Sequence, residues 1–171
     1  MIKLEILGKR KIMAHQLDET DIKILNHLQD HGRAQRNTIA EIVHLSVPSV
    51  SERMRKLEEK GLISNYNAIL DARQFNFDIT AFIFVEVDSS ERYQSFVEHV
   101  TNHPEVLECH SITGGGSHML KVRTRNTESL EKFLSLVQTW DGVTRTRSNI
   151  VLSTFKETRK LPIEQNVEIK K

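Results

Sequence analysis

The stretch RNTIAEIVHLSVPSVSERMRKLEEKG, residues 36–61, decides the fold of the first part of this 171-residue chain. Residues 36–43 have the composition of a short helix, residues 44–46 that of a tight turn, and residues 47–60 that of a second helix. Ser46 suits the N-cap of the second helix and Gly61 suits its end. This layout is typical of a helix-turn-helix, whose second helix enters the major groove of DNA.

The second helix is predicted to have one buried and one exposed side. Val47, Val50, Met54 and Leu57 follow the spacing i, i+3, i+7, i+10, which predicts a single buried stripe. On the opposite side Glu52 can accept from cytosine, and Arg53 on its flank can pair with guanine, whereas Arg55 and Lys56 suit phosphates. A solvated surface helix without DNA contacts is the alternative. The full predicted DNA-binding set is Arg36, Ser46, Ser49, Ser51, Glu52, Arg53, Arg55 and Lys56.

Segments on both sides of this pair complete a small domain. Residues 17–28 have helical periodicity, Asp18 can cap their first turn, and His31 with Gly32 ends them. Residues 62–70 are strand-like and follow the second helix directly. Three helices and a strand predict a winged helix-turn-helix domain, whose wing approaches the DNA backbone.

The remaining chain alternates between strand and helix signals. Strands are expected at residues 81–88, 105–113, 118–124 and 143–155, and helices at residues 90–101 and 127–139. The order βαββαβ predicts a ferredoxin-like domain, so the whole chain is of the α+β class. Both helices of such a domain cover one face of the sheet. Phe82 and Phe84 would lie on the other face, where a second copy of the chain is the simplest cover.

Several motifs together resemble the Lrp/AsnC (leucine-responsive regulator) family of transcription factors. The resemblance runs over roughly residues 15–158 and rests on an ordered set of short matches. It implies a RAM-type ligand-binding and oligomerisation domain, dimers that assemble into octamers around which DNA wraps, and an amino-acid effector. The matching segments include Leu17-Asp18, Gly32-Arg33, Leu45-Ser46, Leu57-Glu58, Gly61-Leu62-Ile63, Ala68-Ile69-Leu70-Asp71, Pro104-Glu105-Val106 and Gly142-Val143.

These observations predict five segments along the chain. They are an N-terminal extension (1–14), the winged helix-turn-helix domain (15–64), a wing strand and linker (65–80), the ferredoxin-like ligand-binding and oligomerisation domain (81–158), and a C-terminal tail (159–171).

A run of glycines between two predicted strands is the candidate effector site. Successive glycines expose backbone N–H groups that can form an anion-binding nest, although the spacing alone favours a flexible hairpin turn. The resemblance places two aspartates of the family at positions 115 and 117, where this chain has Gly115 and Ser117. A different ligand, weak binding and a purely structural loop all stay open. The predicted effector-binding set is Gly114, Gly115, Gly116, Ser117, His118, Thr146 and Ser148.

Composition limits the other classes of function. The formal net charge is +1, and residues 15–64 hold seven Lys/Arg against eight Asp/Glu, so one DNA-binding head would bind modestly and paired heads are expected. A single cysteine, Cys109, excludes an intrachain disulfide. Neither a signal peptide nor a membrane span is evident, so a cytoplasmic protein is expected. No cofactor is expected. The His27/His31 and His99/His103 pairs lack further ligands, so no metal site is expected either.

Two alternatives to sequence-specific regulation stay open. One is an architectural protein that wraps DNA with little sequence preference, because phosphate contacts are independent of sequence. The other is an enzyme similar to siroheme decarboxylases, which share the two-domain plan. Residues 63–67 lack the arginine-rich segment typical of those enzymes, so an enzyme is not expected.

Overall fold

The computed structural model describes residues 17–88 and 91–164. The predicted extension at residues 1–14 lies outside this range, as do the last residues of the predicted tail. The described chain divides into two compact units. One comprises residues up to Ile69 together with those from Thr158 onward, and the other runs from Leu70 to Glu157.

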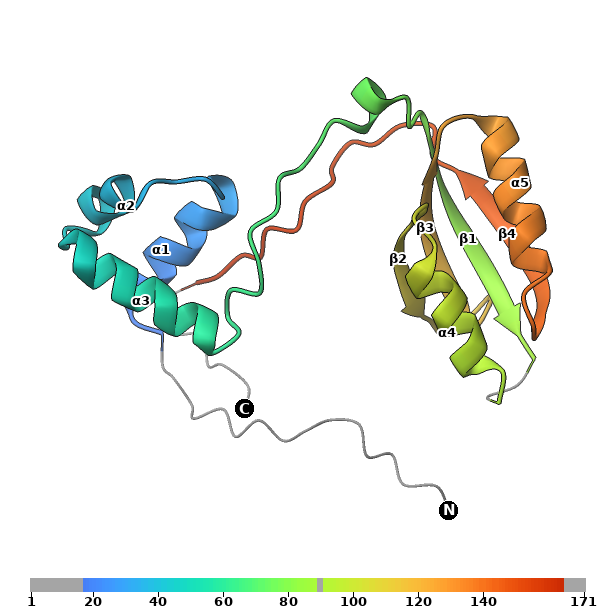
Figure 1. The fold of residues 1–171 in the computed structure, drawn as a ribbon, viewed down its shortest axis with the longest axis horizontal. Coiled ribbons are helices and arrows are strands. Elements are labelled where there is room, and N and C mark those ends of the chain that lie inside the picture. The colour runs from blue at the N-terminus through green and yellow to red at the C-terminus, as the bar shows by residue number, and fades with distance from the viewer. Residues whose placement is uncertain (1–16, 89–90, 165–171) are drawn as a thin grey trace, which may run out of the picture. The chain divides into compact units, whose positions relative to one another are not determined.

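The first unit contains three helices, α1 (Glu19–Asp30), α2 (Arg36–Val43) and α3 (Val47–Glu59) (Figure 1). Both predicted caps are confirmed: the carboxylate of Asp18 accepts from the N–H of Asp21, and the hydroxyl of Ser46 accepts from the N–H of Ser49. The core of the unit combines apolar residues from all three helices, including Ile24, Leu25, Ile39, Val50, Met54 and Leu57.

Two details of this unit differ from the prediction. Residues 64–71 are extended but form no strand, because no described segment pairs with them to take up their backbone hydrogen bonds. The predicted wing strand is therefore wrong. Val47 is 37% exposed rather than buried, since the first turn of α3 extends past the edge of the core.

The second unit confirms the βαββαβ order. It comprises η1 (Ala72–Phe75), β1 (Ile79–Val87), α4 (Tyr93–Asn102), β2 (Val106–Ser111), β3 (His118–Thr124), α5 (Thr127–Gln138) and β4 (Val143–Ile150). The strands form one antiparallel sheet in the order β2-β3-β1-β4. This split arrangement places β1 and β3 at the centre of the sheet.

Alternation along the strands separates a covered face from an open one. Ala81, Ile83 and Val85 of β1 are fully buried and pack with Phe96 of α4 and Phe133 of α5. Both helices thus lie on one face, as predicted. On the open face the Arg147 guanidinium lies over the ring of Phe84, 4.8 Å from its centroid.

The last strand is shorter than predicted. Strand β4 ends at Ile150, and the final bond to β1 is donated by the N–H of Val151 to the carbonyl of Thr80. Because β1 begins at Ile79, residues 152–155 have no neighbouring strand to pair with. The prediction of a strand through residue 155 is therefore wrong.

The turn before β4 depends on one glycine. Gly142 has a φ of +82°, and a Cβ there would lie 2.8 Å from Cβ of Arg92 and 3.2 Å from Cγ1 of Val87. We expect Gly142→Ala to lower the free energy of unfolding by about 2 kcal/mol, through backbone strain and this clash. Thermal unfolding followed by circular dichroism measures the change.

Gly115→Ala is the matched control for this prediction. Gly115 does not have a left-handed backbone, and the nearest atom to its Cβ would be at an ordinary contact distance of 3.5 Å. Equal unfolding temperatures for the two alanine variants would contradict the role assigned to Gly142.

Candidate functional site

The outward side of α3 is the first candidate site. Its exposed residues follow the predicted pattern, while Val50, Met54 and Leu57 are buried against α1 and α2. The polar surface is therefore presented to solvent along the whole helix. The exposed residues on this outward side are Ser46, Pro48, Ser49, Glu52, Arg55, Lys56 and Glu59, and Ser51 is half-buried at its flank.

The charges on this surface neutralise one another. The guanidinium of Arg55 donates to both carboxylate oxygens of Glu52, at 2.7 and 2.8 Å, and also to Glu59. The ammonium of Lys56 lies 3.5 Å from Glu52. The hydrogen bond from Arg55 lowers the pKa of Glu52 to about 2. The i, i+3 and i, i+4 spacing of these pairs can be seen in the sequence. As a result, both cations on the surface that would face DNA are already paired with carboxylates.

Arg53 lies differently from its expected place at the base edges. Its Nη1 donates to Asp18 at 2.6 Å and to Asp21 at 2.8 Å, which connects the middle of α3 to the start of α1. The Asp21 side chain is only 4% exposed, and that of Arg53 is 33% exposed. Arg53 is thus an internal anchor of α3 against α1.

The Asp18 carboxylate serves two elements at once. Partial burial alone would raise its pKa, but the N–H of Asp21 and the Arg53 guanidinium lower the pKa of Asp18 below its usual value of 3.8. Its contribution to stability is therefore complete above pH 3.8 and is lost as the pH falls through the lower folded-state pKa.

Two further residues lie beside this surface. Arg36 is exposed at the first position of α2. Tyr66 follows α3 and donates its hydroxyl to Glu58 at 2.9 Å. Burial and this hydrogen bond raise the pKa of Tyr66 to about 12, so its hydroxyl keeps its proton at neutral pH. No periodic signal in the sequence marks Tyr66.

The glycine loop between β2 and β3 is the second candidate site. Ser117 is bound into the sheet: its Oγ accepts from the N–H of Val87 and donates to the carbonyl of Val85. Its Oγ also lies 3.0 Å from Nδ1 of His118. The His118 ring is buried beside Phe96, and burial lowers the pKa of His118. Ser117 and His118 therefore have packing roles in this structure.

The structure separates the predicted effector residues into two groups. Thr146 pairs with Val85, which pairs with His118 on its other side, so Thr146 lies two strands, about 10 Å, from the histidine. Thr146 accepts a hydrogen bond from Gln138, and Ser148 is exposed further along β4.

Arg147 is the loop neighbour that the sequence prediction missed. A Cβ at position 115 would lie 3.5 Å from Nη2 of Arg147. Among the described residues, no carboxylate forms an ion pair with this guanidinium. Alternation along β4 marks Arg147 as a residue of the open face, but its closeness to the loop depends on the fold.

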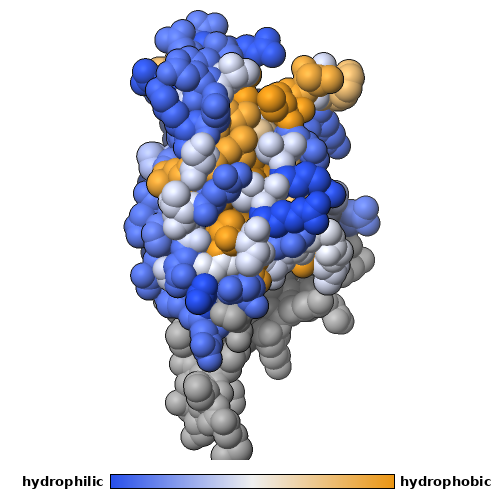
Figure 2. Space-filling view, turned by 90° about the vertical axis from the view of Figure 1, so that its right-hand side faces the viewer, coloured by the Kyte–Doolittle hydropathy of each residue, from blue (hydrophilic) through white to orange (hydrophobic). Residues whose placement is uncertain are grey.

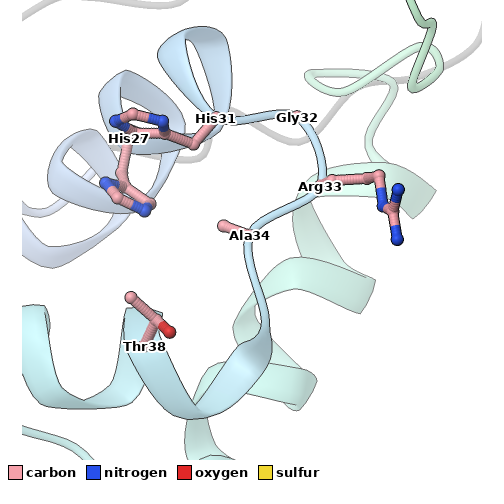
Figure 3. Close-up of a pocket in the computed structure, with 6 residues that line it drawn as sticks. All are labelled: His27, His31, Gly32, Arg33, Ala34 and Thr38. Carbon is pink, nitrogen blue, oxygen red and sulfur yellow. The ribbon is translucent and has the colours of Figure 1, made fainter.

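A hollow of about 620 Å³ lies beside the turn between α1 and α2 (Figure 3). The imidazoles of His27 and His31 face it with ring centroids 4.7 Å apart, Thr38 lies opposite, and Arg33 points away. Within residues 17–88 and 91–164 no three metal-binding side chains come together. In the same part of the chain, no helix is long and apolar enough to cross a membrane.

A helix-turn-helix with an exposed polar helix, joined to a ferredoxin-like sheet domain, defines a two-domain DNA-binding regulator. The family model of the Lrp/AsnC ligand binding domain matches residues 80–161, and that of winged helix-turn-helix DNA-binding matches residues 17–64. Together with the relatives below, these matches show that the chain belongs to the Lrp/AsnC family of transcriptional regulators.

Curated relatives match over most of the chain. HTH-type transcriptional regulator FL11 of Pyrococcus horikoshii is 38% identical over 148 residues, covering 86% of this chain and 97% of that protein. Transcriptional regulator AzlB of Bacillus subtilis is 31% identical, covering 90% and 99%. The leucine-responsive regulatory protein of Klebsiella pneumoniae is 28% identical, covering 93% and 99%.

Solved structures agree with the fold. A Neisseria meningitidis transcriptional regulator in complex with L-Met superposes with a TM-score of 0.83 and 32% identity, over 85% of this chain and 96% of that one. AsnC of E. coli superposes with a TM-score of 0.76 and 25% identity, over 90% and 99%.

The Arg53 anchor leads to a stability prediction. We expect Arg53→Ala to lower the free energy of unfolding of the first unit by about 2 kcal/mol, because a buried carboxylate loses a charged partner. Arg55→Ala is the control, since its ion pairs are exposed, lie within one helix and contribute little to stability. Urea unfolding monitored through helix content measures both. Equal losses in the two variants would argue against the anchor.

Proposed function

We propose that this chain is a sequence-specific transcriptional regulator that binds double-stranded DNA as a dimer or a larger homo-oligomer, up to an octamer. The outer side of α3 carries the proposal, because it combines hydroxyls, a carboxylate and two cations on a helix that is capped and anchored. Ser46, Ser49 and Ser51 lie at its N-terminal end, the part that reaches base edges in this class of domain.

Within this proposal the predicted residues have different roles. Glu52 and the three serines contact bases, whereas Arg36, Arg55 and Lys56 contact phosphates. Arg53 orients α3 through Asp18 and Asp21 and contributes to DNA binding indirectly. The assignment of Arg53 to a guanine contact is therefore not carried into the proposal.

The proposal is tested by electrophoretic mobility shift. The probe is a DNA fragment from upstream of the protein's own gene, with random DNA as competitor at about 150 mM salt, near physiological ionic strength. Retention of the shifted complex against competitor supports sequence-specific regulation. Equal binding to both DNAs would replace it by an architectural, DNA-wrapping role, and no binding at all would contradict it.

The ion pairs on α3 give a prediction for charge variants. Glu52→Gln removes the carboxylate that holds Arg55 and Lys56, so we expect tighter binding to random DNA and a smaller preference for the specific fragment. Lys56→Ala should reduce the slope of log K against log salt by about one. Fluorescence anisotropy at several salt concentrations measures both.

Lys132→Ala is the matched control, because Lys132 is an exposed lysine in an i, i+4 pair with Glu128 on α5, in the other unit. An unchanged salt slope for Lys56→Ala, or an equal change for Lys132→Ala, would remove Lys56 from the DNA surface.

Exposed apolar side chains support self-association. Leu152 and Phe155 are 93% and 98% exposed in the segment that follows β4. Figure 2 shows apolar patches between charged side chains on the side of the sheet domain that carries α5 and β4. Single exposed apolar residues are ordinary, but two bulky ones almost fully exposed in one short segment favour cover by a second copy.

We further propose that the glycine loop binds a small effector through its carboxylate. Position 115 carries no aspartate, and the Arg147 guanidinium lies beside it without an acidic partner in the described structure. The Arg147 guanidinium attracts an anion, and residues 112–117 offer no carboxylate to an ammonium group. A ligand such as an amino acid would then be held by its acid end.

This assignment predicts a ligand preference. We expect L-methionine and its deaminated carboxylic acid to bind with comparable affinity in isothermal titration, and the corresponding amine not to bind. Arg147→Ala should abolish the heat of binding, whereas Arg145→Ala, two residues away on the same face of β4, should retain it. Binding of the amine in preference to the acid would contradict the proposal.

A non-enzymatic role is part of the proposal. The curated relatives described above are named as transcriptional regulators. An absorbance band of a bound tetrapyrrole in the purified protein would instead favour the siroheme-decarboxylase alternative.

A further inference from the structure

The segment that follows the second unit returns to the first and lies along α1. The N–H of Leu161 donates to Oε1 of Gln29 at 2.7 Å, and the carbonyl of Leu161 accepts from Nε2 of the same amide at 3.1 Å. The carbonyl of Ile163 accepts from Nδ2 of Asn26 at 3.2 Å. Two side chains of α1 therefore form hydrogen bonds with the backbone of this segment, at Leu161 and at Ile163.

A charge and an apolar contact complete the docking. The ammonium of Lys160 lies 2.6 and 2.7 Å from the two carboxylate oxygens of Asp30. Ile163 packs against the core of the first unit. Asn26, Gln29 and Asp30 are spaced i, i+3 and i+4, so they lie on one side of α1 and form a continuous recognition surface.

Pro162 prepares the segment for this surface. The pyrrolidine ring fixes its own φ and favours an extended backbone at Leu161, so little conformational freedom is lost on docking. Proline also has no N–H, so position 162 adds no unpaired hydrogen-bond donor between the carbonyls of Leu161 and Ile163, which α1 binds.

The segment is also anchored on its other side. The Glu157 carboxylate pairs with Lys121 and Arg123 of β3 in the second unit. Only Thr158 and Arg159 separate this anchor from Lys160. The chain thus passes between the two units a second time, at Glu157 and Thr158, in addition to the first connection between Ile69 and Leu70.

We propose that residues 160–163 are a strap whose docking on α1 restrains the DNA-binding unit, so that paired units bind DNA more tightly when the strap is docked. The inference rests on the proposed function, since it requires DNA binding by paired units. A unit held by two connections samples fewer orientations than a unit held by one, and the effective concentration of the second head at DNA is therefore higher.

Docking is tested first by limited proteolysis of the full chain. Trypsin cleaves after Arg159 and Lys160, and a docked strap protects both bonds. We expect Gln29→Ala, and separately Ile163→Asp, to accelerate cleavage roughly tenfold, since cleavage follows the population of the open form. Lys156→Ala is the control, because this exposed lysine has no hydrogen bond or ion pair in the described structure. Equal rates in the native chain and in Gln29→Ala would overturn docking.

The restraint is tested by DNA length. Random duplexes of roughly 12 and 30 base pairs admit one head or two. Removal of the strap by ending the chain at Glu157, and Gln29→Ala independently, should weaken binding to the long duplex roughly tenfold and leave the short duplex unchanged. A chain ending at Glu164 keeps the strap and is the control; circular dichroism checks that each variant is folded.

The outcomes separate the two claims. Loss of protection with an unchanged ratio of long to short affinities would overturn the restraint. Absence of DNA binding by the native chain would overturn the proposed function and the restraint with it, while the proteolysis result still decides whether the strap docks.

Discussion

The ion pair between Arg53 and the two aspartates of α1 is the constraint on which the DNA-binding surface depends. Asp18 caps α1 by accepting from the N–H of Asp21, and both carboxylates hold the guanidinium of α3. The apolar core decides which side of α3 is buried, but apolar packing has no direction. A charged hydrogen bond has a defined length and direction, so this pair sets the rotation of α3 about its own axis.

The surface that this anchor presents is close to neutral, and that determines how the protein can use it. Glu52 and Glu59 neutralise Arg55 and Lys56, so a single unit offers few free cations to phosphates. One unit alone then binds DNA with modest affinity. Contacts with bases contribute a larger share of the binding free energy than they would on a strongly basic surface. Such a surface works best when several units act together, which agrees with the bulky apolar residues left exposed after β4.

Local sequence signals were enough to predict most helices and strands. They did not predict which residues far apart in the sequence would contact one another. Ser46, Gly61 and the apolar periodicity located α3 to within a residue, and alternation located β3 at its observed ends. The wing strand failed because strand propensity does not supply a partner, and β4 ended early because β1 begins at Ile79. The partners of Arg53 are 35 and 32 residues away, beyond the reach of any periodic pattern.

The contacts of the strap with α1 could not be predicted from the sequence either. Residues 160–163 have no helical or strand periodicity, and three of the hydrogen bonds that α1 makes with them go to backbone groups, which every sequence shares. Their docking turns the second unit into a domain inserted between residues 69 and 158 of the first. The chain therefore enters the second unit after residue 69 and leaves it before residue 158, and the returning segment binds α1. The start of α1 also holds Arg53, so the same helix binds both the strap and the anchor that sets the orientation of α3.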